Sequence, residues 1–528
     1  MRCNGIPQRF KDRRGRYYGV LNLAAVNLVM LSDDEQCKGL GQPILVIITR
    51  SFNSDFTSYI YDVCGPPLSA MNFPTLSNLL RATTISQVPL SMEYRLFLLI
   101  PLLLLTIITA TSTAKPHSNI TLNSFLTTTT ASARRLSWFS SSGDFAFGFL
   151  PLPTNSSLFL LAIWYANLPN TTTTTIIWTP NRNKPVPSNS SVILTSDGQL
   201  SLRDPAGTEI WNPGAPAASY AALFDTGNFV LVASNGSILW ESFSVPTDTI
   251  LPSQSLSPNS ILLAKLNYDD FSYGRFKLSM QTDGNLVFYQ IAVPTGFQYS
   301  PYWASNTNTS NSFLFFNVSG SIDLVSPTGA FMTTLTSSTT YPTSDFYHRG
   351  TLDHDGVFRH YVHPKPSAAG GAAAEWVVID FKPTDICQSL ITSLGSGACG
   401  HNSYCGYDIK QMVACQCPLG YSWVDPNKTY MGCKPDFTMP SCISGVWSEG
   451  FQMVRVENLD FWGEDYDQFN PMGEAECMQL CLDDCFCAAS IHDGIGNCWK
   501  KKLPFSNGRI GSYVDRIAFI KVGVNKDI

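Results

Sequence analysis

Five side chains with polar or small groups occur at every second position in the stretch QTDGNLVFY, namely Gln281, Asp283, Asn285, Val287 and Tyr289. Alternate side chains of a β-strand point to the same face of the sheet. The spacing therefore predicts one face with two amides, a carboxylate, a phenol and a small apolar patch. A carboxylate only accepts hydrogen bonds, whereas amides both donate and accept them. Such a face suits a ligand covered in hydroxyl groups. The alternative is an exposed antiparallel strand whose polar residues face water.

The segment that must position these residues is predicted to be rich in β-strands. Residues 118 to 380 contain no cysteine, and short runs of alternating apolar residues are separated by Gly, Pro, Asn and Ser, as in "FLLAIWYA" and "LVFYQIA". Regular short strands between turn residues predict an all-β sandwich, barrel or prism.

Looser copies of the same stretch indicate an internal repeat. They are "LTSDGQLSLRD" at 194–204, "LFDTGNFVLV" at 223–232 and "LDHDGVFRHY" at 352–361. Repeats of this length suit a pseudo-symmetric β-prism whose faces share one core, and the segment holds two such units, 118–246 and 250–380. The copies lack several of the polar groups, so we expect one intact site. Their equivalent residues are Thr195, Asp197, Gln199, Ser201 and Arg203; Phe224, Thr226, Asn228, Val230 and Val232; and Asp353, Asp355, Val357, Arg359 and Tyr361.

Composition and missing motifs exclude several classes of function. The chain has 528 residues, 14% of them charged, and a net charge of −6. This length predicts three or four domains, and the lack of a long basic face argues against a nucleic-acid partner. The sequence contains no G-x-S-x-G, H-E-x-x-H, "HRD" or "DFG" motif, so no catalytic residues are expected. "DHDG" at 353–356 resembles the start of a calcium loop but lacks the spaced glutamate, so neither metal nor cofactor is expected.

An apolar stretch predicts that the following residues are exported. Residues 92–114 have a short charged start, an apolar core and small residues at the end, which predicts a signal peptide cleaved after Ala114 or, alternatively, a signal anchor. Residues 1–91 stay unassigned and suggest an over-extended gene model. Eight N-x-S/T triplets predict glycosylation in a secreted or cell-surface protein, at Asn119, Asn155, Asn170, Asn189, Asn235, Asn308, Asn317 and Asn427.

Twelve cysteines lie between Cys387 and Cys498, which in an exported chain predicts disulfides rather than zinc ligands. Residues 383–434 contain six of them and the stretch "CQCPLGY", a pattern similar to EGF-like modules. Spacing alone permits 15 pairings of six cysteines. Residues 442–524 contain "ECMQLCLDDCFCAAS", in which Cys477, Cys481 and Cys485 are expected on one helical stripe, as in PAN/apple modules.

The order of these segments resembles the ectodomain of plant G-type lectin S-receptor-like serine/threonine kinases. The resemblance rests on "WFSSSGDFAFGF" (138–149), "LAIWYAN" (161–167), "IIWTPNRNKPV" (176–186) and "WESFSVPTDTILPSQ" (240–254). It implies a mainly β chain with tandem bulb-type lectin β-prisms, followed by a disulfide-rich EGF-like module and a PAN/apple-like α+β module. By the same resemblance the pairs are Cys387–Cys405, Cys399–Cys415, Cys417–Cys433, Cys477–Cys498, Cys481–Cys487 and Cys442–Cys485.

The resemblance also implies a ligand. In bulb-type lectins the mannose site reads Q-x-D-x-N-x-V-x-Y, which residues 281–289 match in full. Asp283, Asn285 and Gln281 are then expected to hold the 2-hydroxyl, Tyr289 to reach the 4-hydroxyl, and Val287 to cover the apolar side of the ring. Mannose-type glycans or glycoproteins are the implied partners, together with a protein ligand or a homodimer through the PAN module. Alternatives are a fragment of a full receptor kinase, whose transmembrane and kinase parts are missing here, and a dimerisation ectodomain that binds no sugar.

Overall fold

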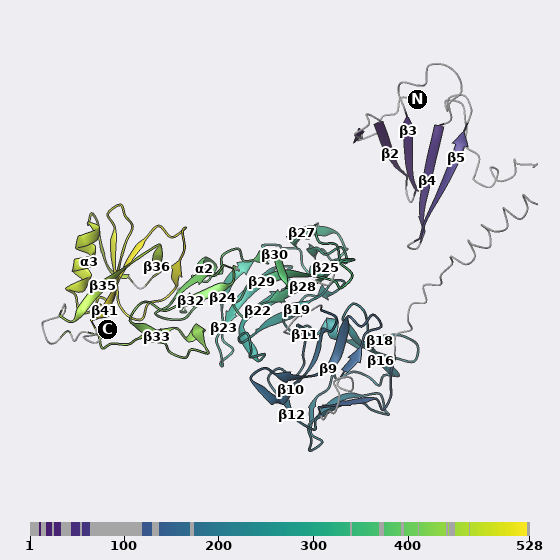
Figure 1. Ribbon diagram of the computed structural model, residues 1–528, viewed down its shortest axis with the longest axis horizontal. Helices are drawn as coiled ribbons and strands as arrows, with labels where there is room; N and C mark the ends of the chain where they lie inside the picture. Colours follow the sequence, from purple (N-terminus) through teal and green to yellow (C-terminus); the bar gives the residue numbers. More distant parts are fainter. Residues whose placement is uncertain are drawn as a thin grey trace, which may run out of the picture. The chain divides into compact units, whose positions relative to one another are not determined.

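The computed structural model describes residues 119–128, 137–168, 174–337, 340–368, 374–391, 395–409, 411–439, 442, 449–463 and 465–524, and the backbone of five strands within residues 10–63 (Figure 1). The chain divides into two compact units, residues 1–111 and 112–528. Among the described residues, no helix has the length and apolar character needed to cross a bilayer. The predicted signal segment, 92–114, lies outside the described residues.

The first unit contains one antiparallel sheet. Its strands are β1 (Phe10–Lys11), β2 (Tyr17–Leu23), β3 (Val26–Ser32), β4 (Ile44–Phe52) and β5 (Asp55–Val63). Each strand pairs with its neighbour in sequence, which makes the sheet a meander. These strands fall within the segment 1–91 to which the sequence analysis assigned no domain.

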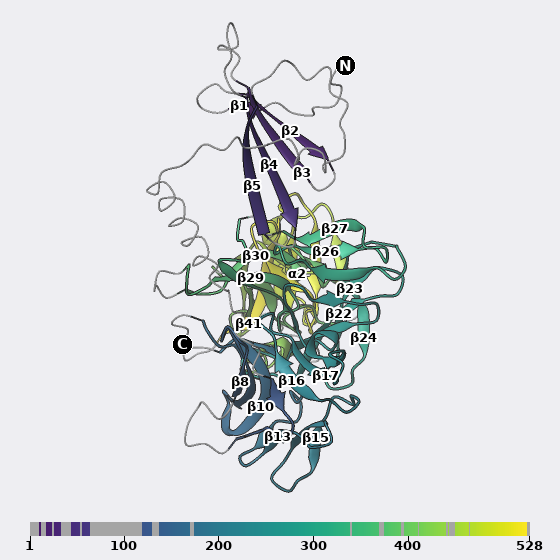
Figure 2. The ribbon, with the colours of Figure 1, turned by 90° about the vertical axis from the view of Figure 1, so that its right-hand side faces the viewer.

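The second unit begins with a β-prism made of three antiparallel sheets around one core. Its strands are β8 (Ser137–Phe139), β9 (Phe145–Leu152), β10 (Asn155–Tyr165), β11 (Ile176–Trp178) and β12 (Val186–Pro187); β7 (Phe125–Thr127), β13 (Ser191–Leu194), β14 (Leu200–Arg203) and β15 (Glu209–Trp211); and β6 (Ile120–Thr121), β16 (Tyr220–Leu223), β17 (Phe229–Val232) and β18 (Ile238–Glu241). Figure 2 shows β10, β13 and β16, one strand from each sheet. Alternate residues of these strands, such as Val192 and Leu194, enter the shared core.

Three tryptophans, one from an end strand of each sheet, pack against one another in this prism. Trp178, Trp211 and Trp240 meet edge to face, with ring centroids 5.7, 5.9 and 6.0 Å apart. Aromatic pairs at these separations and angles are favourable beyond the area that they bury. The three-fold arrangement of the sheets therefore continues into the packing of their edge strands.

A second prism follows, with its own core of buried Leu, Phe, Ile and Met side chains. Its sheets contain β19 (Thr249–Ile250), β28 (Phe346–Leu352), β29 (Phe358–Pro364) and β30 (Val377–Lys382); β20 (Ser255–Leu256), β25 (Phe313–Phe316), β26 (Ile322–Val325) and β27 (Phe331–Thr336); and β21 (Ile261–Lys265), β22 (Tyr273–Met280), β23 (Leu286–Ile291) and β24 (Gln298–Ala304). The short helix η3 (Ser242–Ser244) precedes it. Arg182 of the first prism donates hydrogen bonds to the carbonyls of Phe271 and Leu263, at 2.6 and 2.8 Å.

A five-residue turn recurs in both prisms. In the hairpin of β22 and β23, the Gln281 N–H donates to the Asn285 carbonyl at 2.9 Å and the Gly284 N–H donates to the Gln281 carbonyl at 3.1 Å. The same pair of bonds occurs in residues 195–199, 224–228, 317–321 and 353–357. The copy at 317–325 has other polar residues and was missed by the sequence analysis.

This turn corrects one prediction. The five motif residues do not share one strand, because β23 begins at Leu286 and only Val287 and Tyr289 belong to it. Gly284 adopts a φ of +90°, a left-handed conformation that breaks the extended chain and that other residues rarely adopt. The first three motif residues therefore lie in the turn and the last two in the strand.

Gly284 is expected to tolerate no side chain. An added Cβ would lie 1.9 Å from the backbone oxygen of Thr309, and the positive φ adds backbone strain. We expect Gly284→Ala to lower the free energy of unfolding by more than the roughly 1–3 kcal/mol that backbone strain alone costs, because the close approach to Thr309 adds to it. Urea unfolding measures this loss, with Gly143→Ala as a control, because Gly143 also has a positive φ of 81° but no neighbouring atom within 4 Å of its Cβ position. Equal losses in both variants would rule out the close approach to Thr309 as a cause.

The region after the second prism is rich in disulfides. Its elements are α2 (Ile386–Ser389), β31 (Tyr404–Tyr407), β32 (Val413–Gln416), β33 (Tyr421–Trp423), η4 (Thr429–Met431), β34 (Cys433–Pro435), β35 (Phe451–Glu457), β36 (Leu459–Phe461), β37 (Asp465–Phe469), α3 (Glu474–Leu482), β38 (Ala489–His492), β39 (Cys498–Lys501), β40 (Gly508–Ile510) and β41 (Ile517–Gly523). The disulfides of the structure are Cys387–Cys405, Cys399–Cys415, Cys417–Cys433, Cys442–Cys485, Cys477–Cys498 and Cys481–Cys487, the pairs that the family resemblance implied. Helix α3 ends at Leu482, so Cys485 lies beyond the predicted helical stripe.

The two cysteine-rich segments are joined by a common sheet. Strand β31 of the first segment pairs in parallel with β40 of the second, and β40 also pairs with β36, giving the order β32-β31-β40-β36. One hydrophobic cluster contains Tyr404 and Tyr421 from the first segment and Phe461 and Phe505 from the second. The segments predicted as separate modules therefore pack as one body.

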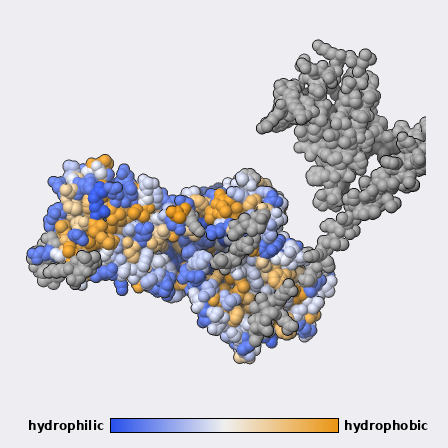
Figure 3. All heavy atoms as spheres, in the orientation of Figure 1, coloured by the Kyte–Doolittle hydropathy of each residue, from blue (hydrophilic) through white to orange (hydrophobic). Residues whose placement is uncertain are grey.

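The predicted glycosylation sites are accessible where the structure describes them. Six asparagines are exposed and Asn317 is half-buried, while Asn170 lies outside the described residues; the exposed ones are Asn119, Asn155, Asn189, Asn235, Asn308 and Asn427. On the face in Figure 3, hydrophobic residues form small groups between hydrophilic ones. Such a surface suits a chain that faces water and can carry glycans.

Candidate carbohydrate-binding site

The motif residues that were predicted from the sequence lie at one end of the β22–β23 hairpin. Leu286 and Phe288 enter the core of the prism, so the alternate residues Val287 and Tyr289 point to its outer side. Both are nevertheless largely covered, with 3% and 8% of their surface exposed. The Lys277 ammonium lies 5.1 Å from the centre of the Tyr289 ring. The apolar patch predicted for Val287 therefore lies at the base of the site and has little exposed surface.

Gln281 and Tyr289 contact each other directly. The Gln281 Nε2 donates a hydrogen bond of 2.6 Å to the Tyr289 Oη. The phenol accepts this bond, so its own proton remains able to donate to a ligand. The amide oxygen of Gln281 is oriented by the same contact. The pair thus supplies one donor and one acceptor at the edge of the site.

The side-chain oxygen of Asn285 is held by Ser305 and Asn306, a pair of hydrogen bonds called the clip below, which was not apparent from the sequence. Its Oδ1 accepts hydrogen bonds from the Ser305 Oγ and from the Asn306 N–H, both at 3.0 Å. The Ser305 Oγ in turn accepts a bond of 3.0 Å from the Leu286 N–H. Because the oxygen of the amide is committed, Nδ2 is the group that faces a ligand. Ser305, which lies 20 residues away in the sequence, therefore fixes the orientation of the Asn285 amide group.

Asp283 is the exposed charge of the site. Its Oδ1 accepts a hydrogen bond of 2.9 Å from the Asn285 N–H, which fixes the carboxylate on the turn. The side chain is exposed to solvent. The arrangement presents a carboxylate acceptor beside the Asn285 amide donor, a combination that fits one hydroxyl group acting as both donor and acceptor.

The copy at 224–232 has the same clip, but its amide donor is directed to a carboxylate of the chain. The Asn228 Oδ1 accepts hydrogen bonds from the Ser242 Oγ and the Phe243 N–H, both at 3.2 Å. The Asn228 Nδ2, however, donates at 2.7 Å to the Glu241 carboxylate. Thr226 stands where the sugar motif has an aspartate, so the copy lacks the charged acceptor as well.

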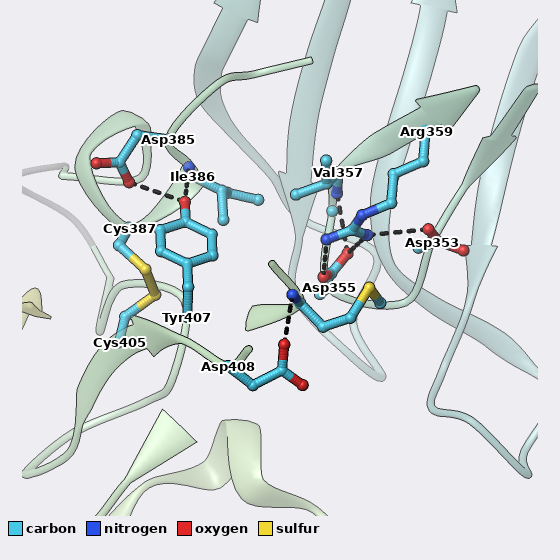
Figure 4. A network of polar contacts seen from close by, with 12 residues as sticks. Asp353, Asp355, Val357, Arg359, Asp385, Ile386, Cys387, Cys405, Tyr407 and Asp408 are labelled. Atoms are coloured by element: carbon cyan, nitrogen blue, oxygen red, sulfur yellow. Dashed lines mark hydrogen bonds and ion pairs between the residues drawn. A yellow bond between two sulfur atoms is a disulfide. The ribbon is translucent and has the colours of Figure 1, made fainter. Parts of the chain in front are cut away.

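The copy at 353–361 is filled by one of its own side chains, as Figure 4 shows. Arg359 occupies the position of Val287, and its guanidinium pairs with Asp353 at 2.9 Å and with Asp355 at 2.7 Å. The Tyr361 Oη donates to the Asp353 carboxylate at 2.6 Å. Burial opposes ionisation of Asp355, but the charge and hydrogen bonds of Arg359 hold its pKa below the usual value. Both carboxylates are therefore committed, and "DHDG" has no free oxygen cluster for calcium.

The two remaining copies also satisfy their polar groups internally. Ser201 donates to Glu209 at 2.7 Å in the copy at 195–203. Ser321 and Thr334 donate to Asp323 at 2.6 and 2.8 Å in the copy at 317–325. Among the copies in the described residues, the one at 281–289 combines an exposed carboxylate with an oriented amide and a phenol.

Comparison with known proteins gives the same kind of domain. A family model described as D-mannose binding lectin matches residues 175–267. The kinase LECRK3 of Oryza sativa subsp. indica, a G-type lectin S-receptor-like serine/threonine-protein kinase, is 43% identical over 441 residues, which are 82% of this chain and 54% of LECRK3. RLK1 of Arabidopsis thaliana, of the same description, is 32% identical over 410 residues, 73% of this chain and 48% of its own.

The chain is related to the G-type lectin S-receptor-like kinases. It spans about half the length of the curated relatives that it matches. The chain is also similar to solved lectins over shorter stretches. The mannose-specific agglutinin of snowdrop (Galanthus nivalis) bulbs, complexed with methyl-alpha-D-mannoside, is 24% identical, with a TM-score of 0.17 over 22% of this chain and 88% of its own. A monomeric mannose-binding lectin of Gastrodia elata is 23% identical, with a TM-score of 0.18 over 26% and 99%.

The hydroxyl of Tyr289 is expected to contribute modestly to sugar binding. Because one neutral hydrogen bond is worth about 0.5–1.5 kcal/mol, we expect Tyr289→Phe to weaken binding of methyl α-mannoside roughly three- to tenfold. Titration followed by NMR measures this change. Tyr361→Phe in the filled copy is the matched control and is expected to leave the affinity unchanged. An unaltered affinity in Tyr289→Phe would remove the phenol from the site.

Proposed function

We propose that this chain is an extracellular lectin region that recognises mannose-type glycans through residues 281–289. The observation that supports the proposal is the turn itself, where the Asp283 carboxylate is exposed and the Asn285 Oδ1 is held by Ser305, whereas the Asn228 amide donates to Glu241 and the Asp355 carboxylate pairs with Arg359 in two of the other copies. The match to a mannose-binding lectin family and the relatives named as lectin receptor kinases point to the same class of ligand.

The groups fit the hydroxyls of one mannose residue. Asp283 accepts a hydrogen bond from the axial 2-hydroxyl, the Asn285 Nδ2 donates to the same oxygen, and Tyr289 donates to the 4-hydroxyl. Net gains over water are about 1 kcal/mol for each neutral hydrogen bond. A single site is therefore expected to bind near the millimolar range, about −4 kcal/mol. Useful binding then requires several sites on one surface.

The experiment is retention of the secreted protein on immobilised mannose and its release by methyl α-mannoside. Retention that methyl α-mannoside releases and methyl α-galactoside does not release supports the proposal, because the two sugars differ only at the 2- and 4-hydroxyls. Equal release by both sugars, or no retention on a densely substituted matrix, contradicts it.

A second candidate is a receptor kinase of which this chain is the recognition part. The match covers 54% of LECRK3, and this partial coverage favours the second candidate. Transcript sequence beyond codon 528 tests it, since an in-frame membrane span and kinase would support a signalling enzyme encoded at this locus.

The partner predicted for residues 442–524, a protein ligand or a second copy of the chain, remains a prediction. Phe486 and Trp462, which are 66% and 55% exposed, are the side chains that such a contact would cover. Sedimentation of the wild type and of Phe486→Ser tests whether this region associates.

A further inference from the structure

Arg275 is a buried cation without a buried anion beside it. The residue lies on β22 and is 6% exposed. Its Nη2 donates one hydrogen bond, of 3.1 Å, to the carbonyl of Ala398. Within the part of the chain that the structure describes, its guanidinium forms no ion pair. The buried Arg359 and Arg182, in contrast, face carboxylates at 2.7 and 3.8 Å.

Aromatic rings compensate part of this burial. The guanidinium carbon of Arg275 lies 5.2 Å from the ring centre of Phe276 and 4.8 Å from that of Tyr430. Burial lowers the pKa of Arg275 to about 10, and the groups that oppose this effect are tyrosines. The side chain stays charged at neutral pH, and a buried charge without a counter-charge is costly.

Arg275 lines a cavity of about 610 Å³ between the second prism and the disulfide-rich region. This volume lies within the range typical of small-molecule sites. The prism contributes Tyr268 and Asn267, and the disulfide-rich region contributes Tyr430 and Asn427. Asp355 also borders the cavity, but its carboxylate is committed to Arg359.

The rest of the wall restricts the kind of anion that fits. Asp269 and Asp270 border the same cavity, and Asp270 accepts hydrogen bonds from the Ser272 N–H and Oγ. These carboxylates repel a ligand that carries several negative charges, but they accept hydrogen bonds from hydroxyls. Lys428 also borders the cavity, and its ammonium pairs with Asp425 at 3.9 Å. One buried guanidinium without a counter-charge, hydrogen-bond acceptors and two tyrosine rings together suit a molecule with a single carboxylate, several hydroxyls and an apolar ring face.

We propose that this cavity binds a carboxylate-bearing sugar of the hexuronate class, with the carboxylate on Arg275 and the hydroxyls toward Asp269 and Asn267. An arginine fork matches a carboxylate in two parallel hydrogen bonds, and this pairing supplies the counter-charge that the folded chain lacks. The site is separate from residues 281–289 and does not depend on mannose binding.

The test uses the full secreted chain, before and after enzymatic deglycosylation because Asn427 borders the cavity, and galacturonate as the probe. Saturable heat of binding for galacturonate in either preparation, and none for galactose, is the expected result. We expect Arg275→Met to weaken galacturonate binding roughly tenfold or more, since a charge-assisted pair is lost. Arg455→Met is the matched control, because Arg455 is a solvent-exposed arginine 43% open to water, and it is expected to change nothing.

Two further readouts separate a ligand site from a structural role. Without ligand, Arg275→Met is expected to melt at the same or a higher temperature than the wild type, because it removes an uncompensated buried charge. Its circular dichroism spectrum, expected to be unchanged, reports that the prism is folded. No binding of galacturonate by the wild type would overturn the proposal. Equal binding of inorganic phosphate and galacturonate would overturn the assignment to a sugar and leave a general anion site.

Discussion

Asp283→Asn is expected to abolish retention on mannose while the chain remains folded. Asparagine keeps an oxygen that can accept the Asn285 N–H bond of 2.9 Å, so the turn is preserved. What is lost is the charged acceptor for a sugar hydroxyl. A hydrogen bond to a charged group contributes about 1.5–3 kcal/mol, so an affinity near the millimolar range falls roughly ten- to a hundredfold, below detection. Affinity chromatography and NMR titration with methyl α-mannoside measure the loss.

The repeat offers a matched control for this substitution. Asp197 occupies the equivalent place in the turn of the copy at 195–203, where Thr195 and Gln199 close the same pair of backbone bonds. Asp197→Asn is therefore expected to retain full mannose binding. If Asp283→Asn also retained it, or if both variants lost it equally, residues 281–289 would not be the binding site.

Arg359→Met is expected to cause a large loss of stability. Arg359 is 2% exposed, and its removal leaves Asp353 and Asp355, whose side chains are only 12% and 7% exposed, without the cation that pairs with both. Breaking a buried ion pair on one side costs about 3–5 kcal/mol. Urea unfolding at neutral pH measures this difference. The double variant Asp355→Asn with Arg359→Met is expected to recover part of the loss in stability, because it removes one of the two carboxylates that have lost their cation.

The pH dependence of this loss distinguishes charge from packing. In the wild type, Arg359 holds the pKa of Asp355 below its unfolded value, so the stabilisation is present at neutral pH and is lost as the pH falls through the lowered pKa. In Arg359→Met the desolvated carboxylate of Asp355 favours the protonated form, so the variant gains stability as the pH falls. The gap between the two proteins is therefore expected to narrow in mildly acidic buffer. A gap independent of pH would assign the loss to packing of the arginine stem.

The sequence predicted the sheets well and the local backbone geometry of residues 281–289 in part. Alternating apolar residues such as Leu286 and Phe288 in "LVFYQIA" indicated strands, because burial on one face leaves a period of two. The disulfide pairs followed from the family resemblance. The extent of the strand at 281–289 was wrong, since the conformation of Gly284 outweighs the alternation around it. Likewise, Cys485 was expected on a helix that ends at Leu482.

What the sequence could not show are contacts between residues far apart. The clip from Ser305 to Asn285 and the bond from Asn228 to Glu241 decide which copy keeps an open amide, and both depend on how neighbouring strands are registered. The copy at 317–325 was detectable only by its glycine at the fourth position of the turn and the alternating apolar residues after it. Arg359 was identified as a departure from the sugar motif, but its role as an internal cation became apparent only in the structure.

Pairing of β31 with β40 has a mechanical consequence. The two strands are parallel, with Tyr404 paired to Gly508 and Cys405 paired to Arg509. They join parts of the chain about a hundred residues apart. Tension applied at the end of the chain near β41 reaches this ladder through β40 and its neighbours. Because parallel strands pulled along their length must shear all their hydrogen bonds together, the disulfide-rich region is expected to resist tension as a single element instead of yielding one segment at a time.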